Sequence, residues 1–157
     1  MPSKVPDVID YLVALFTGAA GIGGAGVNVI DGPKVNASPG PLALWVGVDD
    51  ITNVAGMPSA ATSAQTLAGL GSRAEERLVV YCAVQAYSGS DDVRTQRAAA
   101  YGVVAAAETA IAGDPGLGGN VAARPAVTGV TLRQGPTDRG MTAQVIFSVD
   151  ATALTEP

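Results

Sequence analysis

Few residues in this chain could carry out covalent chemistry. The sequence contains no histidine, which removes the commonest general base and the commonest nitrogen ligand for metals. Its single cysteine, Cys82, falls within an alternating apolar pattern, and no histidine exists to activate it. One cysteine cannot form an intramolecular disulfide, so the sequence implies no oxidising compartment. We therefore predict no catalytic residue, and an enzyme is the least favoured class of protein.

A glycine-rich motif near the N-terminus could in principle hold a phosphate. The segment GIGGAG, residues 21–26, matches the G-x-G-x-x-G pattern of dinucleotide-binding loops. That chemistry needs a strand before the glycines and a helix after them, so that backbone amides meet the pyrophosphate. Here a helical pattern precedes and a strand pattern follows, so we interpret the motif as a flexible connection from helix to strand. A small nucleotide-binding domain remains the alternative from another functional class.

The segment IAGDPGLGG, residues 111–119, is a second dense group of glycines. We predict that Gly113 adopts the left-handed conformation that ends a helix and that Pro115 prevents its continuation. Leu117 would then be a small hydrophobic anchor beneath the turn. Asp114 has the wrong charge for a phosphate site, and no lysine follows it. The segment is therefore predicted to be a structural stop.

Two pairs of neighbouring acids, at 49–50 and 91–92, could supply oxygen ligands to a hard cation. The second pair, together with Ser90, is also well placed to open a helix, because acidic groups favour the positive end of a helix dipole. Adjacent acids alone are a weak signal for a metal. We predict neither a metal site nor a cofactor.

The composition indicates one domain, residues 1–157, that covers much of its surface with other proteins. Hydrophobic residues make up 48% of the chain and charged residues only 15%, against roughly 25% in typical proteins. Sparse charge fits a subunit that associates with copies of itself or with partners. The net charge of −5 and the scattered basic residues argue against stable binding of nucleic acid.

The uncharged stretch at residues 11–30 is long enough to cross a membrane. Its second half is crowded with glycines, which interrupt the apolar pattern. Asp7 and Asp10 flank its start, which argues against a signal peptide. We therefore expect a cytosolic chain with no membrane span and no targeting segment.

The hydrophobic pattern predicts an α+β fold, with a mixed or antiparallel sheet of about five strands and two helices packed on one of its faces. The strand at 75–88 is the clearest, because its even-numbered residues from Leu78 to Ala86 are all apolar, as in a sheet covered on one side. The first helix is predicted to begin with Asp7 as its N-cap. In the order α-β-β-β-α-β-β, the predicted elements are a helix at 7–16, strands at 27–30, 42–48 and 75–88, a helix at about 90–112, and strands at 126–133 and 141–150, the last two joined by the hairpin loop QGPTDRG.

The region at about 49–72 is predicted to be a long flexible or interface loop, because no charge occurs between Asp50 and Arg73. Part of it, SAQTLAGL, could form a short helix. Its larger apolar side chains are the candidate interface residues of the chain. They are Ile51, Met57, Leu67 and Leu70.

Several segments together resemble the tail terminator and related tail-completion proteins of long-tailed bacteriophages. They are VPDVIDYLVALF at the start, a long alanine-rich helix, AETAIAGDPGLGGNV, and GMTAQVIFSVDAT near the end. In that family a helix commonly closes with a turn similar to DPtLGG, which here corresponds to Asp114, Pro115, Leu117, Gly118 and Gly119. The resemblance covers most of the chain in the order of its elements, but its literal motifs cover only the first helix and the last third. The glycine-rich segment at 17–26 and the long neutral loop depart from it.

The resemblance implies a ring, usually a hexamer, that caps the tail tube, stops its growth and presents a surface to the head connector. The implied partners are copies of the chain itself, the tail tube protein and the connector or neck protein. DNA would pass through without specific binding, since the subunits are acidic. The protein would be made in the host cytoplasm and would lie in the virion at the head-proximal end of the tube. A head-to-tail connector or neck protein of the same virion is the alternative within this class.

Overall fold

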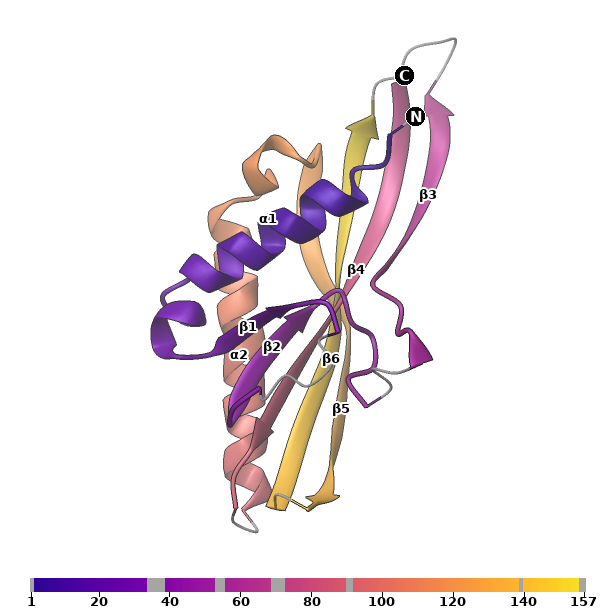
Figure 1. Cartoon of the computed structure of the whole chain (residues 1–157). Coiled ribbons are helices and arrows are strands. Elements are labelled where there is room, and N and C mark those ends of the chain that lie inside the picture. Colours follow the sequence, from indigo (N-terminus) through magenta and orange to yellow (C-terminus); the bar gives the residue numbers. More distant parts are fainter. Residues whose placement is uncertain are drawn as a thin grey trace.

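The computed structural model describes residues 2–33, 39–52, 56–68, 73–89, 92–138 and 140–155. In this part of the chain, a mixed sheet of six strands packs against two α-helices, which confirms the predicted α+β class. Figure 1 shows both helices on the same side of the sheet. The elements are α1 (Val5–Gly18), β1 (Asn28–Asp31), β2 (Leu42–Val46), β3 (Ala61–Ala68), β4 (Arg73–Tyr87), α2 (Val93–Gly113), β5 (Ala123–Thr137) and β6 (Gly140–Thr155).

The centre of the sheet is the antiparallel pair β4 and β6, whose register runs without interruption from Ala74↔Thr155 to Tyr87↔Thr142. The strand order is β1-β2-β4-β6-β5, and β3 pairs with β4 beside this path. β2 and β3 are both antiparallel to β4, and they occupy opposite ends of the same β4 edge. Because β1 runs parallel to β2, the sheet is mixed.

The main core lies between the two helices and one face of the sheet. Alternation along β4 and β6 places every second side chain on this face, and α1 contributes Val8, Leu12 and Phe16 from one helical stripe. Small side chains at Ala100 and Ala107 allow α2 to approach the sheet closely. This confirms the prediction that one face of β4 is buried in the protein core.

A second, smaller apolar cluster lies on the opposite face of the sheet. It consists of Ile30, Ala43, Trp45 and Val48, with Ile51 packed against it. β2 reaches both clusters because Leu44 and Val46 belong to the main core while its alternate residues face the other side.

The region predicted as a loop at 49–72 contains β3, Ala61–Ala68, which includes most of the segment proposed as a short helix. This strand accounts for six strands where the sequence predicts about five. It forms because its backbone pairs in continuous register with β4, from Ala61↔Val80 to Ala68↔Arg73. The predicted hairpin loop QGPTDRG is also mostly strand, since β5 extends to Thr137 and β6 begins at Gly140.

The predicted start of α2 is confirmed, whereas the predicted N-cap of α1 is wrong. Asp92 is the N-cap of α2, and its carboxylate accepts a hydrogen bond from the Thr95 backbone at 3.2 Å, as predicted. Ser90 and Asp91 lie outside the described residues. Asp7, predicted as the N-cap of α1, lies instead in its first turn, and Lys4 is the N-cap. Two acceptors serve this helix end: Glu76 on β4 receives the Lys4 backbone N–H, and the Ser3 hydroxyl oxygen receives that of Val5.

The GIGGAG motif connects α1 to β1. A helix therefore precedes the motif and a strand follows it, as predicted. Ile22 is fully buried in the main core. A Cβ atom at Gly23 would lie 1.9 Å from the carbonyl oxygen of Thr17. At least this glycine is therefore required by close packing of the chain on itself.

The IAGDPGLGG turn places Leu117 in the main core, as predicted. Gly113 is the last residue of α2 and does not have a positive φ, so the prediction for this residue was wrong. The left-handed residues come later, at Leu117, Gly118 and Gly119. Asp114 stabilises the turn by accepting hydrogen bonds from the Tyr11 hydroxyl and from the Gly118 backbone N–H.

By length and composition, Val5–Ala25 could cross a membrane. In the structure, however, α1 has 14 residues and a length of about 21 Å, less than the roughly 30 Å of a bilayer core. Its stripe of apolar residues packs against the sheet. The protein core therefore accounts for this stripe of α1, whereas 22% of the apolar window of the segment is buried in total.

Candidate functional site

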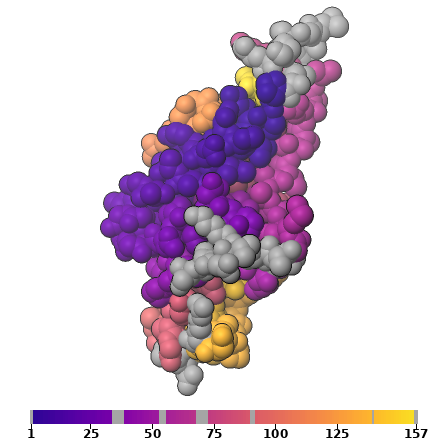
Figure 2. Space-filling view, in the orientation of Figure 1, coloured from indigo at the N-terminus to yellow at the C-terminus, as the bar shows by residue number. Residues whose placement is uncertain are grey.

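The main candidate site is a projecting end of the sheet, made of β3 and residues 73–80 of β4, which we call the arm. Figure 1 shows the arm extending past α1 at the end of the sheet where both chain ends lie. In the space-filling view, β3 (magenta) forms the margin of the molecule beside the start of α1 (indigo) (Figure 2). Residues 62–67 of β3 are all exposed, although successive side chains point to opposite faces. β3 is therefore held by its pairing with β4 rather than by burial.

The outer edge of β3 lacks the features that protect edge strands from pairing with other chains. Ala61–Ala68 contains no charge, proline or glycine, and its register with β4 has no bulge. β5, at the far side of the sheet, contains Pro125, Pro136 and two arginines, and its register with β6 shifts twice. β1 has only four residues and ends at Asp31. Among the described edges, that of β3 is therefore the most suited to pairing with a further strand.

The structure describes three of the four predicted interface residues and places them apart from one another. Met57, which precedes β3, is 90% exposed, and Leu67, near the distal end of β3, is 71% exposed. Ile51 is partly buried against the Trp45 cluster and is thus mainly a packing residue. Leu70 lies outside the described residues. Leu67 is roughly 20 Å along the strand from Ala61, so Met57 and Leu67 belong to opposite ends of β3.

Sequence analysis missed a further exposed apolar residue of this region, Leu154, which is 45% exposed. It lies opposite Glu75, whereas Leu67 lies opposite Ala74, so the two leucines are on opposite faces of the sheet. The alternation of β6 could have revealed it, because Leu154 is out of phase with the buried residues Val149, Ala151 and Ala153.

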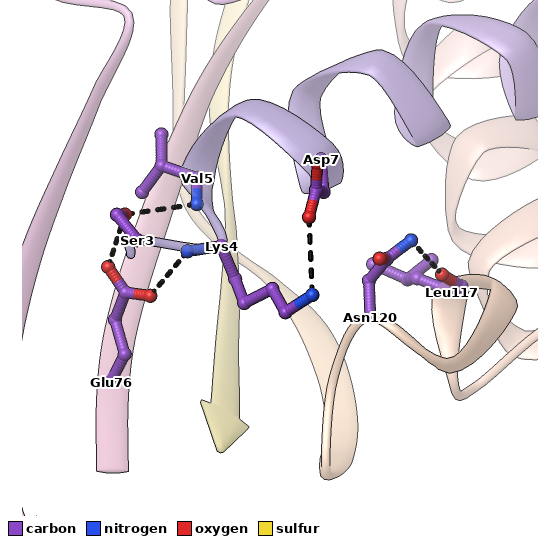
Figure 3. Close-up of polar contacts among 7 residues, drawn as sticks. All are labelled: Ser3, Lys4, Val5, Asp7, Glu76, Leu117 and Asn120. Carbon is purple, nitrogen blue, oxygen red and sulfur yellow. Dashed lines mark hydrogen bonds and ion pairs between the residues drawn. The ribbon is translucent and has the colours of Figure 1, made fainter. Parts of the chain in front are cut away.

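The middle of the arm contains a fully buried carboxylate, Glu76 of β4. The Ser3 hydroxyl donates to its Oε1 at 2.5 Å, and the Lys4 backbone N–H donates to its Oε2 at 2.7 Å. Figure 3 shows the N-terminal segment turning over this carboxylate before α1 begins. On β3, Ser63 and Gln65 point to the same face as Glu76, and hydrogen bonding by their side chains also lowers the pKa of its carboxyl. One carboxylate thus receives donors from two segments that are far apart in the sequence.

Burial opposes ionisation of Glu76, but the hydrogen bonds from Lys4, Ser3, Ser63 and Gln65 outweigh it, so the pKa of this carboxyl lies below its ordinary value. Glu76 is consequently ionised at neutral pH. The Lys4 ammonium does not neutralise it, since its Nζ contacts Asp7 at 3.2 Å (Figure 3).

The side chains considered as possible reactive groups or metal ligands, Cys82, Asp49 and Asp50, are instead part of the packing and the turns. Burial raises the pKa of the Cys82 thiol to about 12, which leaves negligible thiolate at neutral pH. Asp49 accepts from the Ser59 backbone at 2.9 Å, and Asp50 accepts from the backbone and hydroxyl of Thr52. In the described residues, no three Asp, Glu or Cys side chains gather as metal ligands would.

A groove of 740 Å³ lies between the C-terminal halves of α1 and α2. Its walls are mainly alanine and glycine, including Ala14, Ala19, Gly21 and Ala110. Asp114 is at its rim, where it is bound by Tyr11. The groove therefore offers little polar chemistry for holding a ligand.

A scan of the sequence against protein-family models finds no match, and neither does a search of the curated proteins. The functional assignment therefore depends on the surfaces of the molecule and on the resemblance in its motifs.

Proposed function

We propose that this chain is a structural subunit that forms a closed ring at the end of a bacteriophage tail tube. The ring would stop growth of the tube and join it to the head connector. What supports this proposal best is the arm, because its outer strand, β3, has an unprotected edge and carries the exposed apolar side chain of Leu67.

The positions of the sheet edges also favour a ring. β3 and β5 lie on opposite sides of the central pair β4 and β6. A contact from the β3 edge of one copy to a different surface of the next copy would be heterologous, and heterologous contacts close into rings when the rotation permits. The proposal therefore requires that each subunit contribute its arm to one neighbour.

The glycine turn fits the resemblance on which the proposal depends. Leu117 is buried, and Asp114 binds both Tyr11 of α1 and Gly118 within the turn. The residues of the family-like motif thus fasten α1 to the end of α2. This supports an architectural role for the motif rather than a role in phosphate binding.

The deciding experiment combines the purified chain with the tail tube protein of the same phage. Light scattering coupled to size-exclusion chromatography should give roughly six copies of the 15.6 kDa subunit per particle, either alone or in the presence of tubes. Added to polymerising tube protein, the chain should shorten the tubes and appear at one end of each. Tubes that elongate unchecked, with the chain remaining monomeric, would contradict the proposal.

Two further measurements separate the alternatives. Tagged subunits imaged in virions should lie at the tube end, whereas a neck protein would lie one layer nearer the head. Thermal unfolding with and without ATP or NAD tests the nucleotide-binding alternative, which requires an increase in Tm with ligand concentration.

A further inference from the structure

At Glu76, the start of the chain, β3 and β4 come together. Gln65 lies directly opposite it on β3, and Ala153 lies opposite it on β6. The Ser3 hydroxyl, which donates to Glu76, also accepts the Val5 backbone N–H at 3.1 Å. The carboxylate therefore holds the first residues of α1 as well as the strand beside it (Figure 3).

All the hydrogen-bond donors to this carboxylate that are described here are neutral. Lys4 contributes its backbone N–H while its ammonium contacts Asp7, and β3 is uncharged throughout. Glu75 and Arg77 pair with each other at 3.2 Å from positions that alternate with Glu76 along β4. The first turn of α1 adds the positive end of its dipole.

A buried charge without a cationic partner depends on every donor around it. When the donors from one segment are removed, the carboxylate becomes less stable in its site, and it binds the donors of the other segment less firmly. The hydrogen bonds from Ser63 and Gln65 are therefore coupled to those from Ser3 and Lys4, although the two pairs lie in different parts of the chain.

We propose that Glu76 is a coupling residue through which the state of β3 controls the closure of residues 3–8 over the sheet. A strand that docks on the outer edge of β3 would change the positions of Ser63 and Gln65 and, through Glu76, the stability of the start of α1. The docking of such a strand rests on the proposed ring, in which the strand belongs to a neighbouring copy. The coupling itself is a property of the single chain.

Amide hydrogen exchange on the isolated, dilute protein tests the coupling. The double substitution Ser63→Ala and Gln65→Ala should speed exchange of the hydrogen-bonded backbone amides of Lys4, Val5 and Val8 about tenfold, the effect of weakening a hydrogen bond to a charged acceptor. Thr62→Ala and Thr66→Ala form the matched control, because these residues are equally exposed on β3 but point to the opposite face. The control should leave those amides at the wild-type rate.

Glu76→Gln should speed exchange of the same three amides and of those in β3 together. If this variant does not fold, as judged by circular dichroism, the β3 variants still decide the question. Equal exchange of the Lys4, Val5 and Val8 amides in the double variant and its threonine control would overturn the coupling. Because these measurements use the dilute single chain, they are independent of ring formation, and either proposal can fail while the other stands.

Discussion

At the scale of single residues, the turn after α2 places two separate demands on Gly118. Its φ of +67° lies in the left-handed region, and a Cβ atom there would lie 2.4 Å from the Tyr11 ring. The neighbouring Gly119 has a φ of +87° but no atom within 4 Å of the corresponding position. Alanine at position 119 would therefore incur only the cost of the backbone conformation, whereas alanine at position 118 would also incur a steric clash.

Gly119→Ala should lower the free energy of unfolding by about 1–2 kcal/mol, the cost of a left-handed alanine. Gly118→Ala should lower it further, because the methyl group also displaces Tyr11 and disturbs its hydrogen bond to Asp114. Urea denaturation of both variants measures the difference. Equal destabilisation would mean that the Tyr11 ring moves aside without cost.

The sequence permitted only part of this residue-level description. The phase of β4 places Glu76 on the same face as Leu78 and Cys82, so its burial could have been predicted from the alternation. Its partners could not, because Ser3 and Lys4 are more than 70 positions away and nothing local marks them. For the same reason the true N-cap of α1 was not foreseen.

At the scale of elements, β3 is the part of the fold that the sequence concealed. Strands are recognised by alternation between a buried and an exposed face, and β3 has exposed side chains on both faces. Its residues are small or polar apart from Leu67, so no apolar phase exists to detect. β4, by contrast, was predicted almost to its ends because one of its faces is in the core. The arm follows from backbone pairing of β3 with the next strand, β4, and this pairing leaves no apolar alternation in β3 that could be recognised.

Leu67→Glu should prevent ring formation while changing the free energy of unfolding by less than about 0.5 kcal/mol, since the side chain is largely exposed in the single chain. The matched control is Ala105→Glu, which adds the same charge to the exposed face of α2. Light scattering gives the assembly state, and urea denaturation gives the stability. Rings formed equally by both variants would show that the distal arm is not part of the contact.

At the scale of the whole molecule, the free energy of unfolding should decrease at acidic pH, because the fold keeps several carboxylates ionised. The pKa values of Glu76, Asp50 and Asp92 are all below their ordinary values because each accepts hydrogen bonds in the native state. A lowered native pKa contributes stability above the unfolded pKa, and that contribution disappears as the pH falls through the native pKa.

Glu76→Gln should reduce the free energy of unfolding at pH 7 by about 1.5–3 kcal/mol, the range for hydrogen bonds to charged groups. The gap from the wild type should stay constant above about pH 4.3 and narrow at lower pH, where the wild-type carboxylate also becomes protonated. Urea midpoints between pH 3 and pH 7 measure the gap, and Asp50 and Asp92 contribute equally to both proteins. A gap that does not change with pH would indicate that folding leaves the pKa of Glu76 unshifted, and a gap that widens as the pH falls would indicate a raised native pKa; either would contradict the prediction.

The pairing of β4 with β6 has a consequence for how the chain folds as the ribosome makes it. β4 receives its longest partner only as residues 140–155 emerge, 53 to 68 positions after Tyr87, the last residue of β4. Until then its β6-facing edge is open, and the helix-facing core lacks Phe147 and Val149. The nascent chain can form the β3–β4 hairpin and α2 early, but it cannot reach a cooperative native state during elongation. Protection of that open edge by a chaperone, or rapid completion of translation, would therefore govern the yield of folded subunits.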